Sequence, residues 1–314
     1  MIKLEVIHIK RGRINLPKQY IKNKSQFYNQ IGAQVFDLAT PHITKTMSEE
    51  LNIFLIGADV KNKKSMRYKL QNSLKSSANI YLPENIFEEE MFQKEQNLLS
   101  LENILADSVD AVVMCVESPG SFTELGAFSN HKELSQKLIV CPDLKYKRAK
   151  SFINLGPIKY LKQKTNSEIF YLDYSKDLNN KDLPTLIKYI KRIKKNNGIS
   201  NYDISNPIFA ERYVLALLYV LDNINRLNII DIIKTIKNDS DEKEKIISIV
   251  YSALSTLSQK RELNFNFNDK SYSLSTKGKE RLKNEYTQHF IHQNLDILRI
   301  KVLNFQLRRV NRHA

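Results

Sequence analysis

The sequence predicts an α/β protein with a doubly wound parallel sheet, and three observations lead to this prediction. Residues 109–116, VDAVVMCV, form an unbroken apolar run that is typical of a strand buried on both faces of a parallel sheet. Shorter strand-like runs alternate with amphipathic stretches over residues 51–174. With 314 residues and 42% hydrophobic content, the chain is also long enough to form two cores. Alternating strands and helices favour a sheet that is covered on both faces.

The first part of the chain is expected to be an extension to this sheet. Residues 1–50 contain a short alternating stretch and then a helical pattern around KSQFYNQIGAQVFDLA. A proline disfavours helical geometry in the residue before it, so this helix is expected to break at Thr40-Pro41. We interpret residues 1–50 as a partly helical N-terminal extension.

The predicted sheet domain covers residues 51–195. LNIFLIG reads as a strand closed by Gly57, SMRYKLQNSLKSS as an amphipathic helix, and NIYLP as a strand stopped by Pro83. A long helix is expected over residues 86–108, ahead of the central run. After that run come a helix over residues 121–130, the strand KLIVC, a basic loop and a last strand, EIFYLDY. The charged, glycine-punctuated stretch KRIKKNNGIS, residues 191–200, is expected to be a linker.

Residues 200–314 have a different pattern, which predicts a winged helix-turn-helix domain. FAERYVLALLYVLDNI, RLNIIDIIKTIK and DEKEKIISIVYSALSTLSQKREL are three helical stretches. ELNFNFNDKSYSLSTKGKERL then reads as a hairpin around Asn268-Asp269-Lys270, followed by a helix that starts near Lys277. Three helices and a two-stranded wing are the elements of this domain type, and a long helix to about Arg309 closes the chain.

Charge is unevenly spread along the chain, which has a net charge of +15. Residues 131–200 hold 16 Lys and Arg against six Asp and Glu, which indicates contact with a polyanion or else a solvated basic face. The sharpest basic clusters are KYKRAK, residues 145–150, and KYIKRIKK, residues 188–195. The candidate nucleic-acid contacts are Lys145, Lys147, Arg148 and Lys150.

Several functional classes are disfavoured by the composition. Cys115 and Cys141 end apolar runs and read as reduced core residues of a cytoplasmic protein. No stretch approaches the roughly 18 apolar residues that a membrane span requires, and the N-terminus lacks a signal-peptide pattern. The six histidines show no metal-ligand spacing, so we expect neither a metal nor a bound cofactor.

The stretch CVESPGSFTELGAF, residues 115–128, carries the candidate chemistry. Ligands of open parallel sheets bind beyond the carboxyl ends of the strands, where Glu117, Ser118 and Ser121 are expected. Pro119-Gly120 suits a type II turn, and its Gly120 amide and the serine hydroxyls would offer donors to a sugar or phosphate. Glu124 would lie in the first turn of the next helix, where it could attack an anomeric carbon or simply complement the helix dipole. Pattern alone leaves both alternatives open.

This stretch resembles the nucleoside 2-deoxyribosyltransferase superfamily, whose catalytic glutamate is the Glu of a Gly-Ser/Thr-x-x-Glu-(Leu/Ile)-Gly motif. Here the motif is GSFTELG, so the resemblance implies that Glu124 is the nucleophile. It also implies that Gly57 and Asp59 bind substrate and that Glu102 takes the place of a substrate-contacting aspartate. The superfamily usually has an aspartate six residues before its nucleophile, and this chain has Ser118 there, with Glu117 beside it.

A second resemblance rests on three longer stretches, LLSLENILADSVDAVV, ESPGSFTELGAFSN and KSFINLGPIKYL. They resemble the deoxyribosyltransferase-like, winged-helix effector proteins of bacterial retrons, and the likeness covers most of residues 51–314. It implies a toxin of antiviral defence by abortive infection, an N-glycosidase that hydrolyses its substrate NAD at the nicotinamide-ribose bond. It also implies a higher-order assembly in which a reverse transcriptase and its msDNA, an RNA–DNA hybrid, restrain the toxin. Two alternatives are a housekeeping deoxyribosyltransferase and a regulator that senses a nucleotide without cleaving it.

Overall fold

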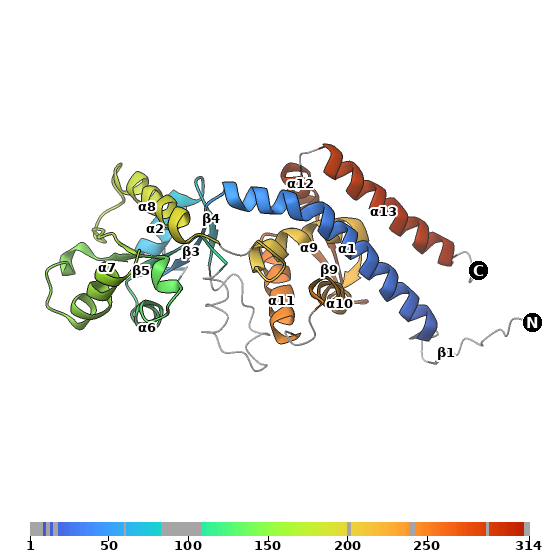
Figure 1. The fold of residues 1–314 in the computed structure, drawn as a ribbon, viewed down its shortest axis with the longest axis horizontal. Coiled ribbons are helices and arrows are strands. Elements are labelled where there is room, and N and C mark those ends of the chain that lie inside the picture. The colour runs from blue at the N-terminus through green and yellow to red at the C-terminus, as the bar shows by residue number, and fades with distance from the viewer. Residues whose placement is uncertain are drawn as a thin grey trace, which may run out of the picture. The chain divides into compact units, whose positions relative to one another are not determined.

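The computed structural model describes residues 9–10, 13–14, 18–59, 61–82, 108–199, 202–238, 243–286 and 289–310 (Figure 1). Residue contacts divide the chain into two compact units. The sheet unit comprises Pro41–Arg212 and Tyr251–Lys260, and the helical unit comprises Met1–Thr40, Tyr213–Val250 and Arg261–Ala314. Neither unit is a single stretch of chain, and the contiguous domains expected at 51–195 and 200–314 stay a prediction.

A five-stranded parallel sheet forms the centre of the sheet unit, as the sequence predicts. The strand order is β4-β3-β5-β6-β7, and the strands are β3 (Asn52–Ile56), β4 (Asn79–Tyr81), β5 (Ala111–Val116), β6 (Leu138–Pro142) and β7 (Glu168–Ile169). The apolar run expected to be central is β5, which is paired on both sides and buried at every residue. The last strand is shorter than expected, because only Glu168–Ile169 and a bridge at Leu172 pair with β6.

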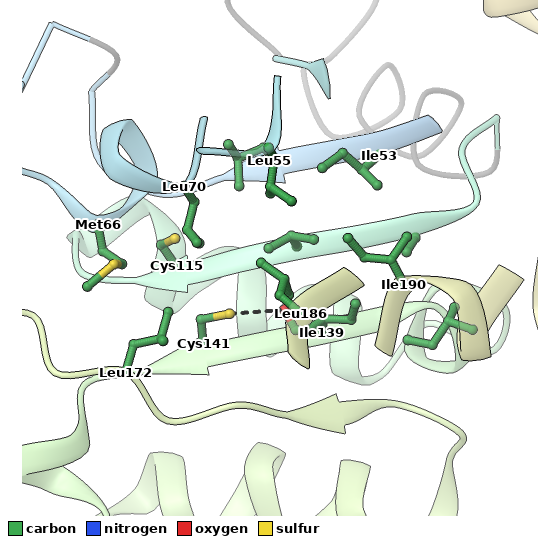
Figure 2. Packing of buried hydrophobic residues seen from close by; sticks show 14 of the residues in the cluster. Ile53, Leu55, Met66, Leu70, Cys115, Ile139, Cys141, Leu172, Leu186 and Ile190 are labelled. Atoms are coloured by element: carbon green, nitrogen blue, oxygen red, sulfur yellow. Dashed lines mark hydrogen bonds between the residues drawn. The ribbon is translucent and has the colours of Figure 1, made fainter. Parts of the chain in front are cut away.

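Helices cover both faces of this sheet. Alternate residues of the strands, such as Leu55, Cys115 and Cys141, pack with one core cluster (Figure 2). The helices in this cluster are α2 (Met66–Leu74) and α8 (Asp182–Asn197). The strand residues between them point to the opposite face, where α6 (Pro119–Ser129) contacts β5. The helix expected over residues 86–108 lies outside the described residues, except for its last residue.

The expected linker at residues 191–200 is wrong for most of its length. Residues 191–197 are the last two turns of α8, which ends where Gly198 follows Asn197. Leu186, Ile190 and Ile193 recur at helical spacing and are fully buried in the core cluster. Burial of such side chains contributes about 1.5–3 kcal/mol each, which outweighs the pattern of exposed lysines between them.

The expected helix break at Thr40-Pro41 is also wrong, because α1 (Lys18–Glu49) continues through Pro41. Pro41 is on the exposed side of the helix, so the carbonyl group that loses its partner can be hydrated. The Thr40 hydroxyl donates to the Phe36 carbonyl oxygen at 2.7 Å. The opposite side of α1 carries a stripe of buried side chains at every fourth position, and its burial keeps the helix intact: Ile31, Val35, Ala39, Ile43 and Met47.

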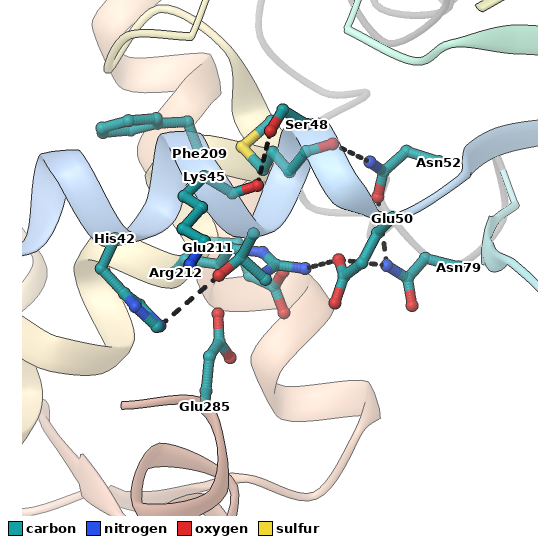
Figure 3. Close-up of polar contacts among 12 residues, drawn as sticks. His42, Lys45, Ser48, Glu50, Asn52, Asn79, Phe209, Glu211, Arg212 and Glu285 are labelled. Carbon is teal, nitrogen blue, oxygen red and sulfur yellow. Dashed lines mark hydrogen bonds and ion pairs between the residues drawn. The ribbon is translucent and has the colours of Figure 1, made fainter. Parts of the chain in front are cut away.

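A polar network lies at the amino ends of the strands, opposite the predicted site. The Asn52 amide, at the start of β3, donates to Asp110 at 2.8 Å, and the Lys194 ammonium reaches Asp110 at 3.2 Å. Glu50 accepts from Arg212 and from the Asn79 amide group (Figure 3). Burial raises the pKa of Asp110, and the Asn52 and Lys194 contacts oppose that shift.

The elements of the C-terminal region follow the expected order. Its helices are α9 (Pro207–Leu221), α10 (Arg226–Lys237), α11 (Lys243–Gln259), α12 (Thr276–Glu285) and α13 (His289–Val310). The expected hairpin consists of β9 (Leu263–Asn266) and β10 (Ser271–Leu274). A third strand that sequence reasoning missed, β8 (Ile224–Asn225), pairs with β10 to give the order β8-β10-β9. None of the helices in the described ranges is long and apolar enough to cross a membrane.

Candidate active site

The carboxyl ends of three neighbouring parallel strands form one edge of the sheet, which we call the rim. Gly57 follows β3, Glu117 follows β5, and Asp143 follows β6. The pairings Ile56 with Met114 and Val116 with Pro142 bring these ends together. The structure therefore gathers at the rim the parts of the sequence that were expected to bind substrate.

Glu117 joins two of these strand ends. Its carboxylate accepts from the backbone amides of Met66 at 2.8 Å, Arg67 at 3.0 Å and Ala58 at 3.3 Å. Two of these amides begin α2, where unpaired backbone donors favour a negative charge. The predicted catalytic residue Glu117 is therefore engaged in holding α2 and the end of β3 against the end of β5.

The turn between β5 and α6 differs from the expected type II turn. Ser118 has extended backbone angles and is the N-cap of α6, with Pro119 at the first helical position. Gly120 is already helical and does not have the positive φ that a type II turn requires. The sequence Ser-Pro-Gly-Ser can form either structure, and the capping interactions decide in favour of the helix.

Ser118 and Ser121 complete this cap with their side chains. The Ser118 hydroxyl accepts from the Ser121 amide at 3.2 Å. The Ser121 hydroxyl accepts from the amides of Ser118 at 2.9 Å and Glu117 at 3.0 Å. Ser121 is fully buried, so its predicted donation to a sugar or phosphate is replaced by a role inside the turn. Ser118 is half-buried and lies nearer the solvent.

Glu124 is the sixth residue of α6, which places it in the second turn and not in the first. The expected stabilisation by the helix dipole, which acts within the first turn, is therefore wrong. Side chains of a helix lean toward its N-terminus, and the N-terminus of α6 is the end that joins β5. A methyl group at Gly120 would meet only the Ser118 hydroxyl, at 3.9 Å. Glu124 itself is half-buried.

The predicted substrate residues Gly57 and Asp59 differ in their surroundings. A methyl group at Gly57 would approach the Arg67 Cβ atom at 2.9 Å and the Cys115 Cβ atom at 3.0 Å, so glycine is required for packing. Asp59 is exposed in the loop before α2, and its carboxylate accepts from the Lys61 amide at 2.8 Å. The exposed Asp59 side chain is therefore open to a ligand, whereas Gly57 serves the packing. Glu102 lies outside the described residues.

Sequence reasoning missed two residues at the rim. Arg67 is buried, and its guanidinium donates to the Ala58 carbonyl oxygen at 2.9 Å. Asp143 caps the turn after β6 and pairs with Lys145 at 3.0 Å. A single arginine in an amphipathic helix and a single aspartate after a strand carry no sequence signal of their own. Within the described ranges, no three His, Cys, Asp or Glu side chains are grouped so that they could hold a metal ion.

The four basic residues expected to contact nucleic acid are all exposed. They follow β6 directly, in and after the short helix η2 (Leu144–Tyr146). Lys145 lies 4.8 Å from the ring centre of Tyr146, and the paired Asp143 raises the pKa of its ammonium group. Lys147 lies 5.4 Å from the ring centre of Tyr171.

Comparison with known proteins identifies the family. The family described as STM3845 retron effector protein matches residues 63–265, which is more than half of the chain. The chain belongs to this retron effector family. Among its relatives is the Escherichia coli protein named "Retron Ec86 putative ribosyltransferase/DNA-binding protein". It is 37% identical over 274 residues, covering 83% of this chain and 86% of the relative.

A second relative is the protein with the corresponding name from retron Ec73 of Escherichia coli. It is 31% identical over 165 residues, which cover 50% of this effector and 48% of the relative. The family match includes β5, the cap of α6 and Glu124, whereas β3 and Gly57 precede the matched residues.

Proposed function

We propose that this retron effector is an N-glycosidase that hydrolyses NAD at the nicotinamide-ribose bond, with Glu124 as the nucleophile. The observation that carries the proposal is the position of Glu124 in the second turn of α6, the helix that directly follows the carboxyl end of the central strand. This is where open α/β sheets bind their ligands. The names of the two relatives, which include ribosyltransferase, agree with chemistry at a sugar carbon.

The proposed reaction has two steps, as in retaining glycosidases. The Glu124 carboxylate attacks C1′ of the nicotinamide ribose, the C1′–N bond breaks, and its electron pair goes to the pyridinium nitrogen. Water then displaces Glu124 from C1′, which gives ADP-ribose and a proton and restores the carboxylate. Asp59, exposed at the end of β3, and Ser118 are the rim groups that could bind sugar hydroxyls.

The proton requirement of the leaving group favours NAD over a nucleoside. When the C1′–N bond to a pyridinium ring breaks, nicotinamide leaves as a neutral molecule and needs no general acid. The departure of a nucleobase usually needs one. Ser118 occupies the position at which the nucleoside 2-deoxyribosyltransferase superfamily usually has an aspartate. The neighbouring Glu117 carboxylate accepts hydrogen bonds from three backbone amides. Departure of nicotinamide therefore requires no proton from Glu117 or Ser118, which suits the pyridinium substrate.

We further infer that the sheet unit has the deoxyribosyltransferase-like fold and that α9 to α12 form a winged helix. The strand order β4-β3-β5-β6-β7 and the three-stranded sheet β8-β10-β9 support these two assignments. In this proposal the enzyme is a toxin of antiviral defence. A reverse transcriptase and its branched msDNA bind the effector and restrain it until phage infection.

One experiment separates the proposal from its alternatives. The purified chain is incubated with NAD, and separately with a deoxyribonucleoside and a second free base, and the products are resolved by liquid chromatography. The proposal predicts nicotinamide and ADP-ribose from NAD. Exchange of bases without NAD cleavage would identify a deoxyribosyltransferase. Binding of NAD with neither reaction would identify a sensor.

A further inference from the structure

Residues 144–164, which follow β6, expose aromatic and basic side chains together. Phe152 is 85% exposed and Tyr146 is 57% exposed, and other large apolar side chains of this segment are also open to solvent: Leu144, Leu155 and Tyr160. The segment has seven Lys and Arg residues, all of them exposed, and no Asp or Glu. An apolar surface of this kind on a soluble unit usually has a partner.

The fold holds this surface in a defined shape. The Asn154 side chain donates to the carbonyl oxygens of Tyr146 at 2.8 Å and Ala149 at 2.7 Å, which ties the two halves of the segment together. The turn η3 (Asn154–Ile158) is a π-helical turn, a rare geometry that is frequent at functional sites. A methyl group at Gly156 would lie 3.7 Å from the Phe152 ring, so this ring rests beside the glycine while most of it faces solvent.

Cations accompany the aromatic rings along the same surface. Lys145 lies over Tyr146, and both Lys147 and Lys162 lie within 5.4 Å of the Tyr171 ring centre. Grooves that bind single-stranded nucleic acid combine positive charges for the phosphates with rings on which bases stack. In a duplex the faces of the bases are covered by their neighbours, so exposed rings favour a single strand.

Two other surfaces of the chain fit a nucleic acid less well. The third helix of a winged helix usually enters the DNA groove, and here α11 is largely buried from Ile246 to Leu257. The hairpin exposes Phe265 and Phe267, but residues 263–274 carry one lysine and one aspartate, so the hairpin has no net charge to attract phosphates.

We propose that residues 144–164 bind single-stranded nucleic acid. Lys147, Arg148 and Lys150 contact its phosphates, and bases stack on Tyr146 and Phe152. The inference deepens the proposed association with msDNA, since it names the strand type and the binding surface. The segment starts at the rim, and η3 contacts α6, so a bound strand lies beside the helix that carries Glu124.

Fluorescence anisotropy with the full chain and no NAD tests the stacking residues. The probe is a fluorescein-labelled 20-nucleotide DNA of mixed sequence, with an RNA of the same sequence as a second arm. Phe152→Ala and Tyr146→Ala should each weaken single-strand binding about tenfold. Phe267→Ala removes a ring that is similarly exposed, 83%, and should leave binding unchanged. The duplex form should bind at least about tenfold more weakly than the single strand.

Salt titrations test the phosphate contacts. Neutralising Lys147, Arg148 and Lys150 with glutamine should lower the slope of log affinity against log salt by about 0.7 for each contact. The matched control neutralises three exposed lysines outside both basic clusters, Lys24, Lys45 and Lys75, and should keep the slope.

Three results would overturn the inference. They are unchanged affinity in the two aromatic variants, equal affinity for the duplex, and equally effective competition by polyglutamate, which would indicate an acidic protein partner. Nicotinamide release is measured separately, so either proposal can fail while the other stands.

Discussion

Glu117→Gln tests whether the carboxylate at the end of β5 holds the start of α2 in place. Glutamine keeps the size of the side chain but offers one acceptor oxygen, and its NH₂ group must face at least one backbone amide. Three amides lose a charged acceptor: Ala58, Met66 and Arg67. A hydrogen bond to a charged group contributes about 1.5–3 kcal/mol, and the half-buried location favours the lower part of this range. We expect local opening to become easier by about 2 kcal/mol.

Hydrogen exchange measured by mass spectrometry reports this change directly. Peptides that cover residues 58–67 should lose about 30-fold of their protection, because 1.4 kcal/mol corresponds to a factor of ten. Glu133→Gln, at an exposed carboxylate of the same unit, is the matched control and should leave these peptides unchanged. Unchanged protection in Glu117→Gln would show that these hydrogen bonds do not hold the loop, and would return Glu117 to the candidates for proton transfer.

Two further predictions concern the glycines of the rim and a buried carboxyl group. Gly120→Ala should leave thermal stability equal or slightly raised, because Gly120 is helical and has open space, whereas Gly57→Ala should cost about 1–3 kcal/mol through its approach to Arg67. Equal melting temperatures for the two variants would refute this packing argument. Burial raises the pKa of Asp110 above 3.8, so the folded protein binds the carboxyl proton more tightly than the unfolded chain does. Protonated Asp110 therefore adds to the free energy of unfolding below pH 3.8, and this contribution is lost as pH rises through the raised pKa. The unfolding free energy of wild type minus that of Asp110→Asn should therefore fall as pH rises above about 4 in urea titrations, and a flat or rising difference would contradict the assignment.

The sheet was predictable because its strands carry a signal that depends on composition alone. The continuous apolar run of β5 and the shorter runs of β3 and β6 are buried at every residue, as a parallel sheet requires. The same order of elements predicted a helix directly after the central strand, and α6, which carries Glu124, is that helix.

Two local predictions failed because burial elsewhere along the chain outweighs the local pattern. Pro41 is tolerated because the buried stripe of α1 lies on the opposite side of the helix. Residues 191–197 resemble a linker in composition, yet Ile193 is buried against the sheet. The roles of Glu117 and Arg67 depend on residues about 50 positions apart, which no local pattern reveals.

The sequence of the turn before Glu124 is compatible with two different local structures. Ser-Pro-Gly-Ser suits a type II turn, but a serine before proline followed by a second serine also suits a capped helix start. The reciprocal bonds between Ser118 and Ser121 favour the second structure. The resulting shift of the helix start moves Glu124 from the first turn to the second.

Nicotinamide release from NAD by wild type and by Glu124→Gln tests the central proposal most directly. Glutamine is nearly isosteric with glutamate but cannot form the glycosyl-enzyme bond, and loss of a nucleophile costs at least about 10³-fold in rate. We expect release from wild type and from the control Glu133→Gln, and a loss of at least this size in Glu124→Gln with circular dichroism unchanged. A Glu124→Gln protein that retains more than about a tenth of the wild-type rate would contradict the assignment of Glu124 as the nucleophile.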